Sequence, residues 1–156
     1  MPALSIDRID VGSERIEVIV RAVPACARTS SVPGIAQRAL ELLPGLARHT
    51  CENGSAHGIV AELADTETAH LLEHIAVELM ALAGSPRTLR AETVWDFARD
   101  GRHVYRVRMA YDVDLVALGA LREGLRVVDW LMNLTAEKPD VDAIVATLRQ
   151  ARMAEA

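Results

Sequence analysis

The sequence predicts an α+β fold in a single domain, a mostly antiparallel sheet with helices packed on one of its faces. Three observations lead to this prediction. Alternating apolar patterns stand on both sides of a strongly apolar helical segment, the later pair of strand patterns is joined by an Asp-Gly turn, and two helical patterns close the chain. A chain of 156 residues is long enough to bury one core. We therefore expect one domain over residues 1–156.

The first half of the chain mixes strand patterns with one short helix. Residues 4–23 alternate weakly between apolar and polar positions, which predicts one or two strands. Residues 35–43 form an amphipathic pattern that stops at a Pro-Gly pair, so a short helix is expected there. Residues 47–51 are expected to be extended and residues 53–54, Asn-Gly, to form a turn. Residues 58–63 are then interpreted as a returning strand.

The central helix carries the strongest signal in the chain. It is predicted over residues 65–83, with Asp65 as a cap and Gly84 just beyond the end, and it has a wide apolar stripe. Strands are predicted over residues 88–97 and 103–111, because an Asp-Gly pair between them favours a hairpin.

Two further helices are expected at the end of the chain. One is predicted over residues 115–134. The other is predicted over residues 140–153, after a Lys-Pro pair, within a C-terminal helical extension of residues 136–156.

Composition excludes several classes of protein. Half of the residues are apolar (51%) and 25% are charged, which argues against disorder. The net charge of −5 argues against a nucleic-acid-binding surface. No apolar run approaches the roughly 20 residues that span a membrane, and the N-terminus lacks the pattern of a signal peptide. Two cysteines make no disulfide framework, so we expect a cytoplasmic protein. The oligomeric state stays open, a homo-oligomer included.

Residues 70–74 read HLLEH and predict a divalent-metal site, with zinc as the expected ion. His70 and His74 are four residues apart, so on a helix they lie one above the other. This is the H-x-x-E-H order of inverted zincins. Two imidazoles and a third ligand leave one position of zinc open for water. Glu73, at the edge of the same face, is predicted to be the general base that takes a proton from this water.

The third ligand is chosen between two residues that precede the helix. His49 and Cys51 lie on the same side of a strand if the segment alternates, and either can reach the site. We predict His49 as the ligand and place Cys51 beside the site as a small buried thiol. Glu78, four residues after His74, is predicted to hold the ring of His74 from behind.

An interpretation without metal competes with this one. His70 and His74 would then be half-buried and hydrogen-bonded to carboxylates. Two observations favour the metal. Two of only five histidines stand at the spacing of metal ligands, and the helix is otherwise so apolar that two imidazoles on it need partners.

Residues 15–135 resemble the N-terminal domain of cyanophycin synthetase. The most specific similarity is the H-x-x-E-H-x-A-x-E-L pattern of residues 70–79, followed by Leu-Ala-Gly at 82–84. Supporting matches include Leu-Leu-Pro-Gly-Leu at residues 42–46 and Val-Tyr-Arg-Val at 104–107. The resemblance implies that the domain holds an Arg/Asp polymer and, as in some members, cleaves it with the metal site. The ATP-grasp and Mur-ligase-like modules of the synthetase have no place in this chain, which lacks a G-x-x-x-x-G-K-[ST] loop.

The chain departs from the family pattern at two places. Ala110 stands where members usually carry an acidic residue, and residues 85–90 replace a Gly-x-Thr-Arg turn. The first change removes a potential ligand or substrate contact, and the second alters a segment expected to bind the polymer.

Three functions follow from these observations. The first is a zinc-dependent hydrolase that cuts an amide bond in a peptide or an Arg/Asp-type polymer. The second, which Ala110 favours, is a non-catalytic module that binds such a polymer or a ligase partner. The third is a lyase or isomerase that uses the metal as a Lewis acid.

Overall fold

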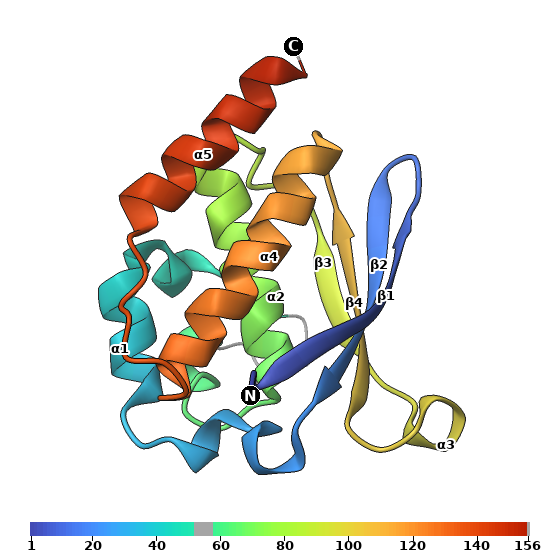
Figure 1. Cartoon of the computed structure of the whole chain (residues 1–156), viewed down its shortest axis with the longest axis vertical. Helices are drawn as coiled ribbons and strands as arrows, with labels where there is room; N and C mark the ends of the chain where they lie inside the picture. The colour runs from blue at the N-terminus through green and yellow to red at the C-terminus, as the bar shows by residue number, and fades with distance from the viewer. Residues whose placement is uncertain (52–57, 156) are drawn as a thin grey trace.

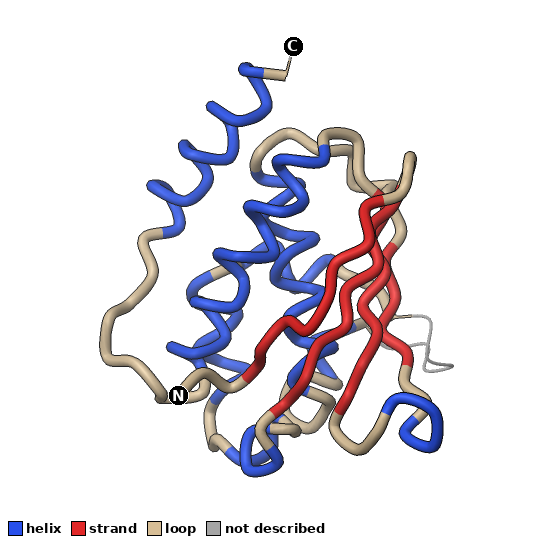
Figure 2. Tube along the Cα trace, turned by 45° about the vertical axis from the view of Figure 1, so that its right-hand side comes forward, coloured by secondary structure: helices blue, strands red, loops and turns tan. Residues whose placement is uncertain are grey.

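The computed structural model describes residues 1–51 and 58–155, and it confirms the α+β fold. Four antiparallel strands form one sheet in the order β1-β2-β4-β3. The long helices cover one face of this sheet (Figures 1 and 2). The turn predicted at residues 53–54 lies outside the described residues.

The sheet has one apolar face because its strands alternate in register. Its strands are β1 (Leu4–Val11), β2 (Arg15–Ala22), β3 (Ala91–Val94) and β4 (Val104–Ala110). Ile16 of β2 lies opposite Met109 of β4, and Val18 lies opposite Val107; all four side chains are fully buried. Since successive side chains point to opposite faces, the residues between them face solvent.

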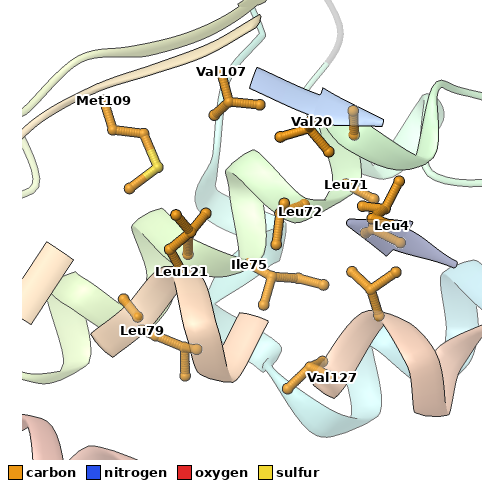
Figure 3. Packing of buried hydrophobic residues seen from close by; sticks show 14 of the residues in the cluster. Leu4, Val20, Leu71, Leu72, Ile75, Leu79, Val107, Met109, Leu121 and Val127 are labelled. Atoms are coloured by element: carbon orange, nitrogen blue, oxygen red, sulfur yellow. The ribbon is translucent and has the colours of Figure 1, made fainter. Parts of the chain in front are cut away.

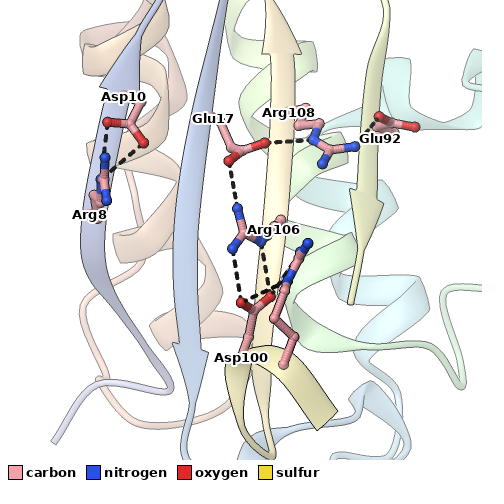
Figure 4. A network of polar contacts seen from close by, with 8 residues as sticks. Arg8, Asp10, Glu17, Glu92, Asp100, Arg106 and Arg108 are labelled. Carbon is pink, nitrogen blue, oxygen red and sulfur yellow. Dashed lines mark hydrogen bonds and ion pairs between the residues drawn. The ribbon is translucent and has the colours of Figure 1, made fainter. Parts of the chain in front are cut away.

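Charged residues cover the other face of the sheet. Arg106 binds Glu17 and Asp100, and Arg108 binds Glu17 and Glu92 (Figure 4). The hydrogen bond from Arg108 has the largest effect on the pKa of Glu17 and lowers it. Arg106 lowers this pKa further, and burial opposes both. These ion pairs keep this face of the sheet polar, so the helices pack on the opposite, apolar face.

Helix α2 (Thr68–Leu82) lies at the centre of the molecule and packs against both the sheet and helix α4 (Asp114–Leu131). It is buried on nearly every side, and its buried residues include the polar His70, Glu73, His74 and Glu78. Leu72, Ile75 and Leu79 fill the space between sheet and helices (Figure 3). A side chain at Gly124 of α4 would meet Leu72 at 3.0 Å, so this glycine permits the close approach of the two helices.

The remaining helices surround this centre. Helix α1 (Ile35–Leu42) agrees with the predicted one. Helix α5 (Val141–Ala154) begins after Asp140, whose side chain accepts a hydrogen bond from the Ala143 amide. No helix of the described chain is long and apolar enough to cross a membrane.

One strand prediction near the central helix was wrong, and one extended segment is shorter than predicted. Ile59–Ala61 is a 3-10 helix, and only the isolated bridge between Thr50 and Gly58 remains of the expected returning strand. Of the segment expected to be extended, residues 47 and 48 belong to the 3-10 helix Pro44–Arg48, which has proline in its first turn, whereas His49 is extended and Thr50 forms the bridge. The β-branched pair at residues 59 and 60 favours a strand by propensity, but no strand of the sheet lies beside it to pair with.

The predicted hairpin and cap differ in detail. β3 covers only Ala91–Val94, and the short helix α3 (Phe97–Asp100) precedes Gly101, so the connection is longer than an Asp-Gly turn. Asp65 does not cap α2, because its carboxylate is paired with Arg28, and Glu67 occupies the cap position.

Candidate metal centre

One side of helix α2 borders a cavity of about 820 Å³. His70, Glu73 and His74 line one of its walls, and β3 lines another. His49 and Cys51, which follow the 3-10 helix Pro44–Arg48, also line the cavity. The structure therefore brings together the residues that the sequence analysis selected from distant positions.

The rings of His70 and His74 face each other as their four-residue spacing requires. Their Nε2 atoms are 3.0 Å apart, and both side chains are almost fully buried. The protonation of the two facing nitrogens decides whether this contact attracts or repels, and it follows from what the opposite nitrogen of each ring contacts.

A chain of hydrogen bonds connects Glu78, His49 and His74. The Nε2 atom of His49 is 2.9 Å from Oε1 of Glu78, and a carboxylate only accepts, so this nitrogen carries the proton. The Nδ1 atoms of His49 and His74 are 2.9 Å apart, and one of them donates to the other. In the tautomer with the proton of His74 on Nδ1, its Nε2 atom presents a lone pair to His70.

Thr66 fixes the tautomer of His70. The hydroxyl of Thr66 donates to Glu67, so it accepts from Nδ1 of His70 at 2.9 Å. The Nε2 atom of His70 then also bears a lone pair. With both protons on Nδ1, the two Nε2 lone pairs, 3.0 Å apart, can share a positive charge such as a metal ion.

Burial disfavours an additional proton on either ring. Burial, helped by the neighbouring His70 and His49, lowers the pKa of His74 to about 3. Burial also lowers the pKa of His70. Both rings are therefore neutral at physiological pH, which is the form that binds a metal ion.

Cys51 contributes the third convergent donor. Its Sγ atom is 3.4 Å from Nε2 of His70, and the donor atoms of Cys51, His70 and His74 lie within 4.8 Å of one another. Two imidazole nitrogens and a sulfur suit zinc. His49 instead contacts the opposite nitrogen of His74. The geometry thus favours an exchange of the predicted roles, with Cys51 as ligand and His49 behind His74.

The carboxylate of Glu73 lies beside the Nε2 atom of His74. Its Oε2 atom is 3.3 Å from Nε2 of His74, and its Oε1 atom accepts a hydrogen bond of 2.9 Å from the hydroxyl of Thr93. Burial raises the pKa of Glu73 to about 7, against the smaller opposing effect of the Thr93 bond. A carboxyl group with this pKa takes up and releases a proton near neutral pH.

Glu78 acts on His74 through His49 and not directly. Burial alone would raise its pKa, but the hydrogen bonds from His49 and Arg87 outweigh this and lower it to about 2. A side chain at Gly45 would collide with a carboxylate oxygen of Glu78, so the glycine leaves room for the carboxylate. The Glu78–His49–His74 chain is an orienting device of the kind common behind metal ligands.

Sequence reasoning did not identify Thr66, Thr93 or Gly45 as parts of the site, and it considered Arg87 only as a contact for a substrate carboxylate. Thr66 and Thr93 belong to no motif, and Thr93 reaches Glu73 only because β3 packs beside α2. Gly45 was visible as part of a Pro-Gly helix stop. Arg87 was visible as an arginine after the helix, but its pairing with Glu78 depends on the folded chain.

Comparisons with known proteins agree with the resemblance seen in the sequence. The sequence profile described as the cyanophycin synthase-like N-terminal domain matches residues 15–133. A cyanophycin synthetase of Synechocystis sp. is 35% identical over 57 residues, which are 36% of this chain and 6% of the relative. Another, of Geminocystis herdmanii, is 29% identical over 102 residues, which are 57% of this chain and 12% of the relative. The matches therefore span only a small part of these synthetases.

Proposed function

This chain belongs to the family of cyanophycin synthase-like N-terminal domains, and from that premise we propose that it is a metal-dependent hydrolase of an amide bond in a peptide or amino-acid polymer. The observation that carries the proposal is the convergence of Nε2 of His70, Nε2 of His74 and Sγ of Cys51, with a carboxylate oxygen of Glu73 beside them. The substrate is argued from the family, whose printed relatives are synthetases of cyanophycin.

Three residues hold the ion in this proposal. Nε2 of His70, Nε2 of His74 and Sγ of Cys51 are the donors, and zinc is the ion that this set suits. When bound, the ion supplies Lewis-acid polarisation of a water molecule and of the substrate carbonyl and favours the ionised form of Glu73. His49 and Glu78 keep the ring of His74 in the tautomer and orientation that binding requires.

Glu73 moves the proton in the reaction. Its Oε2 atom accepts a proton from the attacking water as the oxygen bonds to the amide carbon. As the carbon–nitrogen bond breaks, Oε2 returns this proton to the leaving nitrogen, so the carboxylate is regenerated. The hydrogen bond from Thr93 holds Oε1 and leaves Oε2 directed at the site.

A second candidate is a module that binds a polymer or a ligase partner without chemistry. Membership of the family favours it, because the matched relatives are synthetases of which this domain is a small part. Ala110, which lines the cavity, also favours it, since a potential acidic contact is lost there.

Metal analysis combined with one conservative variant distinguishes the two candidates. We expect the purified protein to bind one zinc ion, and Glu73→Gln to keep the ion but lose cleavage of an Arg/Asp polymer and of peptides, read as new amino termini. Equal turnover in Glu73→Gln would overturn the hydrolase proposal. Polymer binding without cleavage by the zinc-loaded protein would support the binding module.

A further inference from the structure

We propose that the open edge of β3 binds an extended acidic peptide by main-chain pairing, and that arginines around the cavity hold its carboxylates. The inference rests on the proposed function, since it names the class of chain that would be presented to Glu73 and the metal ligands. It adds a binding mode and a charge preference to that function.

The hydrogen-bonding pattern of β3 leaves one side of the strand open. β3 is the outer strand of the sheet and pairs with β4. The amide of Ala110 donates to the carbonyl of Arg90 at 2.9 Å, so in an antiparallel ladder Glu92 is the next residue that bonds to β4. The main-chain groups of Ala91 and Thr93 therefore point away from β4. Among the described residues, no hydrogen bond reaches these outward groups.

The open edge runs beside the candidate reaction centre. All four residues of β3 line the cavity, and the Thr93 hydroxyl donates to Glu73. A peptide that pairs with the main chain of Ala91 and Thr93 would thus pass next to Glu73. Addition of a strand to a sheet edge is a common mode of peptide recognition, because main-chain bonds give affinity without regard to side chains.

The charge of the cavity wall selects among extended peptides. The protein as a whole has a net charge of −5, yet among the residues that the structure describes arginines outnumber carboxylates on this wall. The described arginines are Arg15, Arg48, Arg87, Arg90 and Arg108, and the described carboxylates are Glu73 and Glu92. Part of this positive charge is compensated, since Glu78 binds Arg87, and Glu17 and Glu92 bind Arg108.

Two of the arginines keep their charge available for a ligand. Arg15 and Arg48 are exposed and form no ion pair with any residue in the described ranges. A guanidinium group binds a carboxylate through two parallel hydrogen bonds, so such arginines favour acidic side chains and repel basic ones. The combination of an open strand edge and excess arginine points to an acidic peptide.

Main-chain pairing is tested by removing one outward amide. Ala91→Pro removes an N–H on the open edge and keeps the ladder with β4, because proline is tolerated on edge strands; Ala91→Val is the matched control. Binding of a fluorescent poly-glutamate peptide is measured by anisotropy. We expect Ala91→Pro to raise the Kd about tenfold, the equivalent of one lost hydrogen bond, and Ala91→Val to leave it within about twofold. Equal Kd values for the two variants would overturn main-chain pairing.

A change in the peptide tests the same point if Ala91→Pro fails to fold. Poly-glutamate that is N-methylated at alternate residues keeps its charge but loses main-chain donors. We expect it to bind the unmodified protein about tenfold more weakly than the parent peptide. Undiminished binding would contradict the pairing.

The charge preference is tested by reversing one arginine. Arg48→Glu should weaken poly-glutamate binding about five- to tenfold, whereas Arg102→Glu, an exposed arginine away from the cavity, should not. A poly-lysine peptide of equal length should bind at least about tenfold more weakly than poly-glutamate. Binding of poly-lysine as tight as that of poly-glutamate, or equal effects of the two reversals, would overturn the acidic preference.

Failure of this inference is distinguishable from failure of the proposed function. Peptide binding is measured with the metal chelated and needs no turnover. Metal-dependent cleavage of an amide polymer without poly-glutamate binding would overturn the docking edge and leave the hydrolase standing. Poly-glutamate binding that follows the Ala91 and Arg48 variants, without any cleavage, would support the docking edge and contradict the hydrolase.

Discussion

At the scale of single residues, the account depends on which nitrogen of each ring carries its proton. In this account Glu78, through His49, and Thr66 each hold one proton on the far side of a metal-facing ring. The helical spacing of His70 and His74 was predictable from the sequence, because it follows from the period of a helix. The roles of His49 and Cys51 were not, since both lie on one short segment and only the packed chain decides which atom of His74 each one faces.

Cobalt spectroscopy tests the third ligand. We expect the Co²⁺-loaded protein to show absorption from thiolate-to-cobalt charge transfer, because sulfur is a direct donor in this account. Cys51→Ser should abolish this absorption, whereas His49→Gln should keep it and lower the metal affinity about 10- to 100-fold. Survival of the band in Cys51→Ser would contradict the assignment.

Gly45→Ala tests the orienting chain without touching a donor. The new methyl group would lie where a Glu78 oxygen now lies, so the carboxylate must leave His49. We expect zinc affinity, measured by competition with a chelating dye, to fall at least about tenfold. Ala47→Ser, an exposed change on the same turn, is the control. The role of Glu78 would be refuted by an unchanged affinity in a folded Gly45→Ala protein.

At the scale of elements, long periodic segments were predictable and short ones were not. The two long helices and the two long central strands agree with the sequence patterns, because each buries a continuous apolar face. The Ile59–Ala61 segment looked like a strand by propensity, yet a strand needs a partner edge that lies elsewhere in the fold. Asp65 looked like a cap, but Arg28, distant in sequence, binds its carboxylate.

Arg152 is expected to attach helix α5 to the domain. Its guanidinium group donates to the carbonyl of Ala83, to Ser85 and to Asp112 at 2.7–2.8 Å. Arg152→Met should lower the free energy of unfolding by about 1–2 kcal/mol in urea denaturation, because the buried acceptors on Ala83 and Ser85 lose a charged donor. Gln150→Met, an exposed change on the same helix, should have little effect. A loss of similar size in both variants would argue against this attachment.

The same contact predicts a pH dependence. The hydrogen bond from Arg152 lowers the pKa of Asp112 below its ordinary value of 3.8, despite burial. A lowered pKa means that the stabilisation is present above the pKa of the unfolded state and is lost as the pH falls through the folded one. The difference in unfolding free energy between the natural protein and Arg152→Met should therefore be constant near neutral pH and shrink below about pH 4. A difference that grows in acid would contradict the contact.

At the scale of the whole molecule, the core and the candidate site are formed by different parts of the sheet. The helix-covered face builds the core around α2, and the edge of the sheet at β3 opens on the cavity. Sequence patterns predicted the two layers but not the cavity, because its walls come from α2, β3 and the segment around residue 50. The composition of that wall, rich in arginine in an acidic protein, is visible only after folding.

Metal binding should therefore stabilise the whole fold. Zinc that binds only the folded protein adds about 2.7 kcal/mol of stability at a free concentration 100-fold above Kd. We expect zinc to raise the melting temperature of the natural protein and a chelator to reverse the effect. His70→Ala should not respond, whereas His103→Asn, a change at a left-handed turn residue with φ of 63°, should respond normally. An equal response of His70→Ala would place the ion elsewhere.

The most direct test of the central claim is a crystal structure of the zinc-loaded protein, with an anomalous difference map recorded at the zinc absorption edge. The account predicts one strong peak in bonding contact with Nε2 of His70, Nε2 of His74 and Sγ of Cys51, with Glu73 beside the open position. A peak bonded to His49 in place of Cys51 would contradict the ligand assignment. No peak between His70 and His74 would contradict the metal centre itself.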